Sequence, residues 1–215
     1  NFLNGNGDFR SDECLEYLKQ CDIVVTNPPF SLFRDFISLV VEYNKDFLVI
    51  GNNVALGYKE IFPLIQQNKL RPGYKTSNKD SYFDIPEDVQ NELIETNRSS
   101  SFKIINGKIF GRVSTIWFTS LKVVGKPFIT DYTKEFSNSE YKHYQNFDAI
   151  HINKLVDIPK DYYGVIGVPI TFLERCNIDD FDIIQFRKGN DGKDLCYFDE
   201  TSNKLITPFT RILVK

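Results

Sequence analysis

Residues 22–30, with the sequence DIVVTNPPF, decide the fold of this chain. Residues 21–26 form a β-branched run without hydrophobic alternation, which is typical of a buried parallel strand. The strand must stop at Asn27-Pro28-Pro29-Phe30, because two successive prolines donate no backbone N–H to a sheet. These residues therefore predict a buried strand that runs straight into a rigid turn.

Helices and strands alternate on both sides of this turn. Residues 11–20 predict a helix capped by Ser11, and residues 31–43 predict a second helix with apolar side chains at helical spacing. Residues 47–51, FLVIG, predict another buried strand, and residues 58–67 predict a further helix. Strand and helix alternating in this way are typical of a doubly wound α/β sheet.

The second half of the chain predicts shorter strands and longer loops. Asn106-Gly107 between two short apolar runs indicates a type I′ hairpin, and residues 114–121, STIWFTSL, predict a strand. The polar residues 87–101 predict a loop. A short helix near residues 170–175 and a final strand at residues 211–215 are expected among further short strands.

Composition narrows the class of protein. The chain has 215 residues, 41% of them hydrophobic, and a net charge of −3, so it is too apolar to be disordered. It has no run of about 18 uncharged apolar residues, so no membrane span is expected. Four cysteines without CxxC spacing, and the separated His143 and His151, predict reduced thiols in a cytoplasmic protein and no metal site. Since the sequence does not begin with Met, we expect the true N-terminus to lie upstream.

The turn at Asn27-Pro28-Pro29-Phe30 carries the predicted chemistry. A strand ending in Asn-Pro-Pro-aromatic resembles the amino-methyltransferases that use S-adenosylmethionine (AdoMet). The exocyclic amine of adenine is a weak nucleophile, because its lone pair is delocalised into the ring. The resemblance implies that the Asn27 side-chain oxygen and the Pro28 carbonyl accept hydrogen bonds from the two N–H groups of this amine. It also implies that Phe30 stacks on the extruded base. A purely structural turn is the alternative.

Further blocks resemble the EcoRI-type adenine-specific DNA methyltransferases. The resemblance covers most of the chain and is carried by residues 7–11 (GDFRS), 22–36 (DIVVTNPPFSLFRDF), 47–55 (FLVIGNNVA), 58–65 (YKEIFPLI), 114–121 (STIWFTSL) and 167–175 (GVPITFLER). It implies an enzyme that transfers a methyl group from AdoMet to adenine N6 in a specific DNA sequence. Double-stranded DNA is then the partner, together with a cognate restriction endonuclease that acts on the same site.

The same resemblance implies a fold and a division of the chain. We expect an α/β architecture in which residues 1–125 form a partial Rossmann-like, AdoMet-dependent methyltransferase sheet. Residues 126–215 are expected to form a mixed, β-rich target-recognition region. Enzymes of this type place an AdoMet-binding strand and turn upstream of the matched segment, and we expect this chain to lack that N-terminal part.

The resemblance assigns two further groups of residues. Asp8 and Phe9 are expected to bind AdoMet together with Asn27, and an ordinary loop before a helix is the alternative. Trp117 or Phe118 is expected to line the target-base pocket with Phe30. Because side chains alternate along a strand, only one of the two can face that pocket, and plain core packing is the alternative.

A cluster of basic residues interleaved with tyrosines is the expected DNA contact. Its cations are Lys69, Arg71, Lys75 and Lys79. Net charge is a poor guide to nucleic-acid binding when cations gather locally, so the net charge of −3 does not exclude such contacts. A solvated loop is the alternative interpretation.

Other functions remain open from the sequence. Asn-Pro-Pro-aromatic turns also occur in enzymes that methylate guanine N2 in ribosomal RNA and in protein-glutamine methyltransferases. A non-catalytic DNA-binding fragment is an alternative from a different class of protein.

Overall fold

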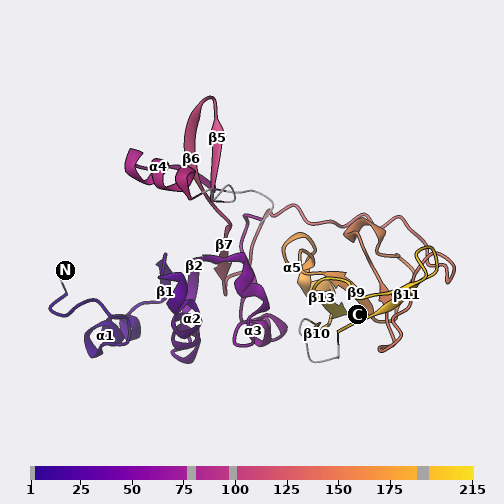
Figure 1. The fold of residues 1–215 in the computed structure, drawn as a ribbon. Coiled ribbons are helices and arrows are strands. Elements are labelled where there is room, and N and C mark those ends of the chain that lie inside the picture. The colour runs from indigo at the N-terminus through magenta and orange to yellow at the C-terminus, as the bar shows by residue number, and fades with distance from the viewer. Residues whose placement is uncertain (1–2, 77–80, 97–100, 188–193) are drawn as a thin grey trace. The chain divides into compact units, whose positions relative to one another are not determined.

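A computed structural model describes residues 3–76, 81–96, 101–187 and 194–215 (Figure 1). The chain folds as two compact units. Unit 1 comprises Asn1–Ala55 and Pro72–Leu121, and unit 2 comprises Leu56–Arg71 and Lys122–Lys215. Helices and several small sheets make up the two units, so the predicted α/β class is confirmed in its general form.

The main sheet of unit 1 contains the strand that ends at the Asn-Pro-Pro turn. Its strands lie in the order β1 (Ile23–Thr26), β2 (Asp46–Asn52), β7 (Thr115–Thr119) and β3 (Arg71–Pro72). β1 and β2 run parallel, with Val24 opposite Phe47, and this confirms both strands predicted around the turn. β7 confirms the strand predicted at residues 114–121 and runs antiparallel to β2, so the sheet is mixed.

Both helices predicted beside β1 are present. Helix α1 (Asp12–Gln20) begins after Ser11, whose Oγ accepts a hydrogen bond from the backbone N–H of Cys14 at 3.4 Å. A short 3-10 turn, Phe30–Leu32, follows the two prolines and leads into helix α2 (Phe33–Glu42). The Ser11 cap therefore confirms the start predicted for α1, and α2 confirms the helix predicted from apolar spacing after the prolines.

Helix α2 packs on one face of the main sheet and forms the core of unit 1. The centroid of the Phe33 ring on α2 lies 4.9 Å from that of Phe118 on β7. Gly51 on β2 lies beneath these two rings. A Cβ atom added at Gly51 would come within 2.5 Å of Phe33 and 2.9 Å of Phe118, so this close approach of helix and sheet requires glycine.

β1 is less buried than its sequence predicts. It is an edge strand, and its Ile23 and Val25 side chains are 47% and 66% exposed. Val25 pairs with Leu48, so it lies on the sheet face opposite to the one that packs on α2. No helix among the described residues of unit 1 buries that face of β1. The prediction of a fully buried strand is therefore wrong, because only one face of β1 is covered.

A small sheet is inserted in the chain between β3 and β7. Its strands lie in the order β4 (Ser81–Asp84), β6 (Lys108–Val113) and β5 (Phe102–Ile105). Asn106 and Gly107 join β5 to β6 with φ angles of 50° and 77°. These left-handed values are the ones that a type I′ turn requires, so the predicted hairpin is confirmed.

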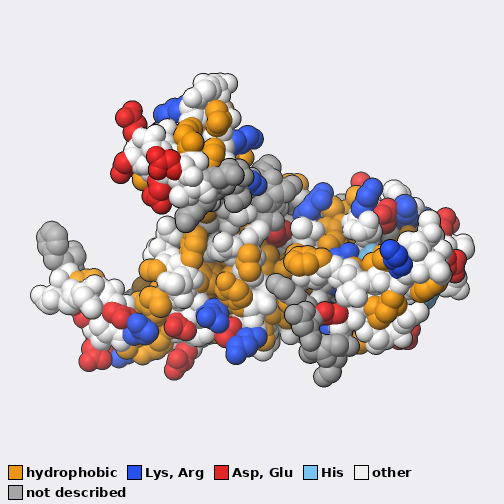
Figure 2. Space-filling model, viewed as in Figure 1, with side chains coloured by type: hydrophobic (Ala, Val, Ile, Leu, Met, Phe, Trp, Pro, Cys, Tyr) orange, Lys and Arg blue, Asp and Glu red, His pale blue; other side chains and the backbone are white. Residues whose placement is uncertain are grey.

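The loop predicted at residues 87–101 is wrong for its first part. Glu87–Glu95 form helix α4, which Pro86 precedes. Glu87 and Asp88 occupy its first turn, where the helix dipole favours acidic side chains. This stabilisation favours a helix, although the polar composition of the segment is typical of a loop. Residues 97–100 lie outside the described residues. Figure 2 shows acidic side chains over α4 and Lys and Arg side chains over the β5–β6 hairpin.

The main sheet of unit 2 is antiparallel apart from one edge. Its strands lie in the order β10 (Ile183–Arg187), β13 (Arg211–Val214), β9 (Ile166–Pro169) and β8 (Ile150–His151). β13 is buried along its whole length and confirms the predicted final strand. Helix α5 (Phe172–Arg175) confirms the short helix predicted near residues 170–175. β11 (Tyr197–Asp199) and β12 (Lys204–Ile206) form a separate hairpin.

The helix predicted at residues 58–67 is shorter in the structure. Helix α3 spans Phe62–Gln66, with Pro63 in its first turn. The carbonyl of Tyr58 accepts hydrogen bonds from the backbone N–H groups of both Ile61 and Phe62. Residues 58–61 therefore form a turn that leads into the helix rather than its first turns.

An aromatic cluster surrounds His151 in unit 2. The His151 Nδ1 atom lies 2.8 Å from the Tyr144 hydroxyl oxygen, and its ring stacks on Tyr197 with centroids 4.6 Å apart. Burial, and after it the nearby positive charges of Arg211 and Lys142, together lower the pKa of His151 to about 4. His151 is therefore neutral at physiological pH and packs, half-buried, against the aromatic rings of this unit.

The remaining compositional predictions concern thiols and membranes. All four cysteines are free thiols: Cys14, Cys21, Cys176 and Cys196. Within the part of the chain that the structure describes, every helix is too short or too polar to cross a membrane.

The turn between β5 and β6 generates the first prediction. Replacing Gly107 by Val should destabilise the hairpin by about 1–2 kcal/mol, because a side chain disfavours the left-handed backbone. Steric clash makes no contribution, since a Cβ at residue 107 meets nothing within 4 Å. Amide hydrogen exchange in β5 and β6 should therefore accelerate. Lys103→Val on β5 is the control and should leave exchange nearly unchanged; equal acceleration in both variants would contradict the turn assignment.

The half-buried His151 generates a pH prediction. Its pKa is about 4 in the folded protein, against about 6.5 in the unfolded chain, so the unfolded state binds the proton first as the pH falls. Stability contributed by neutral His151 is therefore present above pH ~6.5 and is lost progressively between pH ~6.5 and ~4. Thermal denaturation across this range should show the loss, and His151→Gln should reduce it. The exposed His143→Gln is the control; a similar reduction there would contradict the assignment.

Candidate active site

The Asn-Pro-Pro turn lines a hollow of about 340 Å³ at the carboxyl end of β1. The hollow is lined by Asn6, Gly7, Asp8, Phe9, Thr26, Asn27, Pro28, Pro29, Leu32 and Phe36. It therefore brings together the three residues expected to bind AdoMet, which are Asp8, Phe9 and Asn27. Crevices at the carboxyl ends of parallel strands are the usual ligand sites of open α/β sheets.

The turn itself leaves its polar groups available. Pro28 is buried and Pro29 has extended backbone angles, so the turn is rigid, while Asn27 is exposed. Within the described residues, neither the Asn27 side-chain amide nor the Pro28 carbonyl takes part in a hydrogen bond. Both oxygens can therefore accept hydrogen bonds from a ligand in the hollow.

Asp8 enters the hollow as a carboxylate held by its neighbour. Its Oδ1 atom accepts hydrogen bonds from the Arg10 backbone N–H at 2.9 Å and from the Arg10 Nε at 3.0 Å. Its Oδ2 atom accepts one from the Arg10 Nη2 at 3.0 Å. These bonds lower the pKa of Asp8 to about 2. The group is ionised at all physiological pH values, and Oδ2 retains capacity for a further donor.

Phe9 is fixed by an aromatic contact with α2. Its ring meets Phe36 nearly edge-on, with centroids 5.3 Å apart. Leu32 and Phe36, four residues apart and one helical turn beyond the prolines, complete that wall of the hollow. The sequence predicts Phe36 only as one of the apolar side chains at helical spacing in residues 31–43. The i, i+4 spacing directly after the turn was the signal that could have placed both residues at the site.

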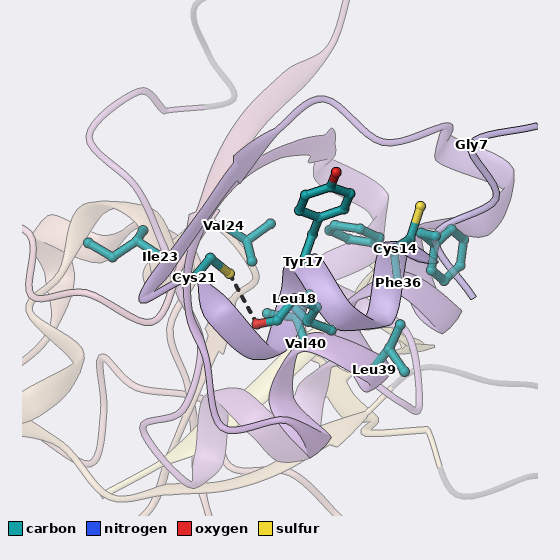
Figure 3. A pocket seen from close by; sticks show the side chains of 11 residues that line it. Gly7, Cys14, Tyr17, Leu18, Cys21, Ile23, Val24, Phe36, Leu39 and Val40 are labelled. Atoms are coloured by element: carbon teal, nitrogen blue, oxygen red, sulfur yellow. Dashed lines mark hydrogen bonds between the residues drawn. The ribbon is translucent and has the colours of Figure 1, made fainter. Parts of the chain in front are cut away.

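A second, mostly apolar hollow of about 320 Å³ adjoins the first and lies between α1, β1 and α2 (Figure 3). It shares Gly7, Phe9 and Phe36 with the first hollow. In Figure 3, the Sγ atom of Cys21 donates to the Leu18 carbonyl, at 3.2 Å, at the end of α1. The aromatic pair of Phe9 and Phe36 therefore has a polar hollow on one side and an apolar hollow on the other.

The residues expected at the target base take different places. Phe118 is fully buried against Phe33, whereas Trp117 is partly exposed on the opposite face of β7 and packs over Gly73. Phe30 is 41% exposed. None of these three side chains lines the hollow at Asn27. Of the two strand residues, Phe118 thus serves the core and Trp117 remains accessible.

The basic cluster is divided between protein contacts and solvent. Arg71 forms a two-pronged ion pair with Asp179, with N···O distances of 3.0 and 3.3 Å. The Lys75 Nζ atom donates to the Ser81 hydroxyl at 2.6 Å and to the Thr115 carbonyl at 2.9 Å. Lys69 is exposed, and Lys79 lies outside the described residues. Lys69 and Arg71 belong to unit 2 and Lys75 to unit 1.

The sequence matches the model of the family described as adenine-specific methyltransferase EcoRI over residues 1–211. The chain belongs to this family. It is 42% identical over 213 residues to the type II methyltransferase M.EcoRI of Escherichia coli, a match that covers 98% of this chain and 62% of the relative. The EcoRI-type resemblance predicted from the sequence blocks is therefore confirmed.

Two mycoplasma proteins are further relatives of this EcoRI-family chain. M.MgeORF184P of Mycoplasma genitalium is 46% identical over 188 residues, which cover 85% of this chain and 57% of the relative. M.MpnI of Mycoplasma pneumoniae is 40% identical over 185 residues, with the same coverage of both chains. Both are named type II methyltransferases. The chain thus spans about three-fifths of the length of these relatives, and no solved structure matches it significantly.

The placement of the two β7 aromatics generates a prediction. Phe118→Ala should lower the free energy of unfolding by about 3–5 kcal/mol, because it opens a cavity against Phe33 in the core. Trp117→Ala removes a partly exposed ring and should cost clearly less. Urea denaturation measures both losses of stability. It is followed by the backbone circular dichroism, because one of the variants removes the tryptophan. Equal losses of stability would contradict the assignment of Phe118 alone to the core.

Proposed function

We propose that the protein transfers a methyl group from AdoMet to N6 of adenine in a specific DNA sequence, as the methylase of a restriction–modification system. Membership of the EcoRI adenine-specific family and the type II methyltransferase names of the relatives support this reaction. The observation that carries the proposal is the meeting of Asp8, Phe9 and Asn27 in one hollow at the carboxyl end of β1.

The residues of this hollow suit the adenosine part of AdoMet. Its volume of about 340 Å³ is near the lower end of the range for ligand pockets. The ionised Asp8 can accept a hydrogen bond from an adenine amine, and Phe9 offers an aromatic ring beside it. When bound, AdoMet supplies an electrophilic methyl group on a sulfonium. Asn27 is the third residue that we assign to binding it.

The turn would activate the target amine by position and fixed dipoles. The Asn27 side-chain oxygen and the Pro28 carbonyl accept hydrogen bonds from the two N–H groups of the target adenine amine. They thereby draw its nitrogen toward tetrahedral geometry. Pro28 and Pro29 hold these acceptors in place and add no competing donor. Phe30 is accessible enough to stack on the extruded base, and Trp117, rather than the buried Phe118, is the second candidate for that pocket.

We assign different roles to the two parts of the chain. Residues 1–125 carry the catalytic turn, and residues 126–215 carry target recognition. In the basic cluster, exposed Lys69 can meet a DNA phosphate directly, whereas Arg71 must first leave Asp179. Double-stranded DNA is the substrate, and a cognate restriction endonuclease that acts on the same sequence is the expected companion.

Replacing Asn27 by Ala in the full-length protein tests the mechanism. The change removes one preorganised acceptor at the reacting amine, and such groups contribute about 100-fold or more to kcat. Transfer of labelled methyl groups from AdoMet to DNA should fall by that amount, with the thermal stability unchanged because Asn27 is exposed. Base-modification mapping should show N6-methyladenine with the wild-type protein.

Asn153→Ala, the same change at an exposed position in unit 2, is the matched control and should keep full activity. Full methylation by Asn27→Ala would contradict the assigned mechanism. Methylated guanine in ribosomal RNA, or methylated glutamine in protein, without N6-methyladenine in DNA would instead support one of the other methyltransferase reactions.

A further inference from the structure

Two arginines lie directly opposite each other in the main sheet of unit 2. Arg187 is the last residue of β10 and pairs with Arg211, the first residue of the neighbouring antiparallel strand β13. Figure 1 labels both strands. Directly opposed residues point to the same sheet face, with Cβ atoms about 4.5–5.5 Å apart. Like charges in that position repel each other, so this pair destabilises the sheet unless an anion neutralises it.

Among the described residues, no carboxylate pairs with either arginine. Arg211 is only 9% exposed, and its Nη1 atom donates to the backbone carbonyls of Phe209 and Thr210, which are neutral acceptors. The Nε atoms of Arg187 and Arg211 are both buried and have no hydrogen-bond partner there. Leaving a buried charged donor unpaired is costly, so the two guanidinium groups have unused capacity for an anion.

The surroundings of the pair strengthen this capacity. The Arg187 guanidinium lies 5.9 Å from the centroid of the Phe147 ring, and Leu213, two residues after Arg211, packs in a cluster with Tyr144. Aromatic and aliphatic neighbours lower the local dielectric and make each charge–charge interaction stronger than in water. Asp199, a carboxylate of the same unit, pairs with Lys142.

The positive potential is also felt by the neighbouring histidine. After burial, the charges of Arg211 and Lys142 are the causes that keep the pKa of His151 low. The groups that face His151 include Tyr144 from the preceding loop, Tyr197 from β11 and Lys142, and the positive charge of Lys142 is paired with Asp199. Among the described residues, Arg211 therefore has no paired carboxylate, and Arg187 places a second positive charge beside it.

We propose that Arg187 and Arg211 together bind one phosphate group of the DNA backbone. The planar guanidinium fork matches the oxygens of a phosphate, and two forks on one sheet face can hold a phosphodiester from both sides. The assignment to DNA rests on the proposed function, which places target recognition in residues 126–215. Free phosphate has the same chemistry, so the experiment separates the two sources.

The test measures DNA affinity of the full-length protein over a series of salt concentrations. Each phosphate contact contributes about 0.9 to the slope of log affinity against log salt, so Arg187→Ala should reduce the slope by about one and weaken binding about tenfold at 0.1 M salt. Arg187→Lys keeps the charge and should keep the slope. Lys160→Ala is the control, since Lys160 belongs to the same unit and pairs with Glu135.

Arg211 is buried, so its conservative variant gives the second measurement. Arg211→Lys should fold, retain the salt slope and bind DNA several-fold more weakly, because the second fork is lost. Thermal denaturation of each variant confirms folding. Unchanged slope and affinity in folded Arg187→Ala would overturn this inference while leaving the proposed methylation intact.

The outcomes also separate the two proposals and the two phosphate sources. If the wild-type protein binds DNA and Arg187→Ala reduces the salt slope as expected, but the wild type does not methylate DNA, the proposed reaction fails and the phosphate site stands. If the wild-type protein does not bind DNA, the phosphate assignment is overturned. If inorganic phosphate raises the melting temperature of the wild type but not of Arg187→Ala, while the DNA slope stays the same, the site takes a small anion and the DNA assignment is wrong.

Discussion

Two missing backbone donors govern the arrangement of unit 1. Pro28 and Pro29 carry no N–H, so β1 cannot continue, and the chain turns at once into the helical segment that begins with Phe30. Helix α2 then lies back on the sheet, where Phe33 reaches close to Gly51. Asn27 is left at the strand end with its amide free of contacts to the described residues, and it faces a hollow instead of a neighbouring strand.

The hollow combines a rigid wall with a fixed charge. The rigid wall is the proline turn and the start of α2, which supplies Phe36 against Phe9. The fixed charge is Asp8, held by three hydrogen bonds from Arg10 and therefore ionised and oriented before any ligand arrives. Preorganised groups of this kind lose little entropy on binding, which is the physical advantage of building a site on element ends.

Charge is arranged differently in unit 2. In unit 1 the Asp8 carboxylate has its counter-ion Arg10 two residues away, whereas Arg187 and Arg211 face the same side of a sheet and share no carboxylate among the described residues. Within the described part of the chain nothing offsets the repulsion of this pair, because like charges opposed across a ladder reduce stability. Departures from such local rules are expected at functional sites, where a ligand completes the interaction. The opposed arginines therefore mark this end of the β10–β13 pair as a candidate site.

Predictions from the sequence succeeded where the cause is local and failed where it is not. The Asn106-Gly107 hairpin depends on backbone freedom at two residues, and the cap of α1 depends on Ser11 alone, so the chain itself contains those causes. Burial of β1 depends on what covers its second face. Helix α4 was missed because acidic residues in a first turn and in a solvated loop look alike in sequence.

The sequence by itself determined the strand that ends in Asn-Pro-Pro-aromatic, the family of the chain and the candidate residues Asp8, Phe9 and Asn27. Tertiary structure decided that these three share one hollow and that Phe118 packs in the core while Trp117 stays accessible. It also decided that Arg71 pairs with Asp179 and that Arg187 faces Arg211. The physical reason is that residue type and spacing define local backbone chemistry, whereas burial and ion pairing depend on partners distant in the chain.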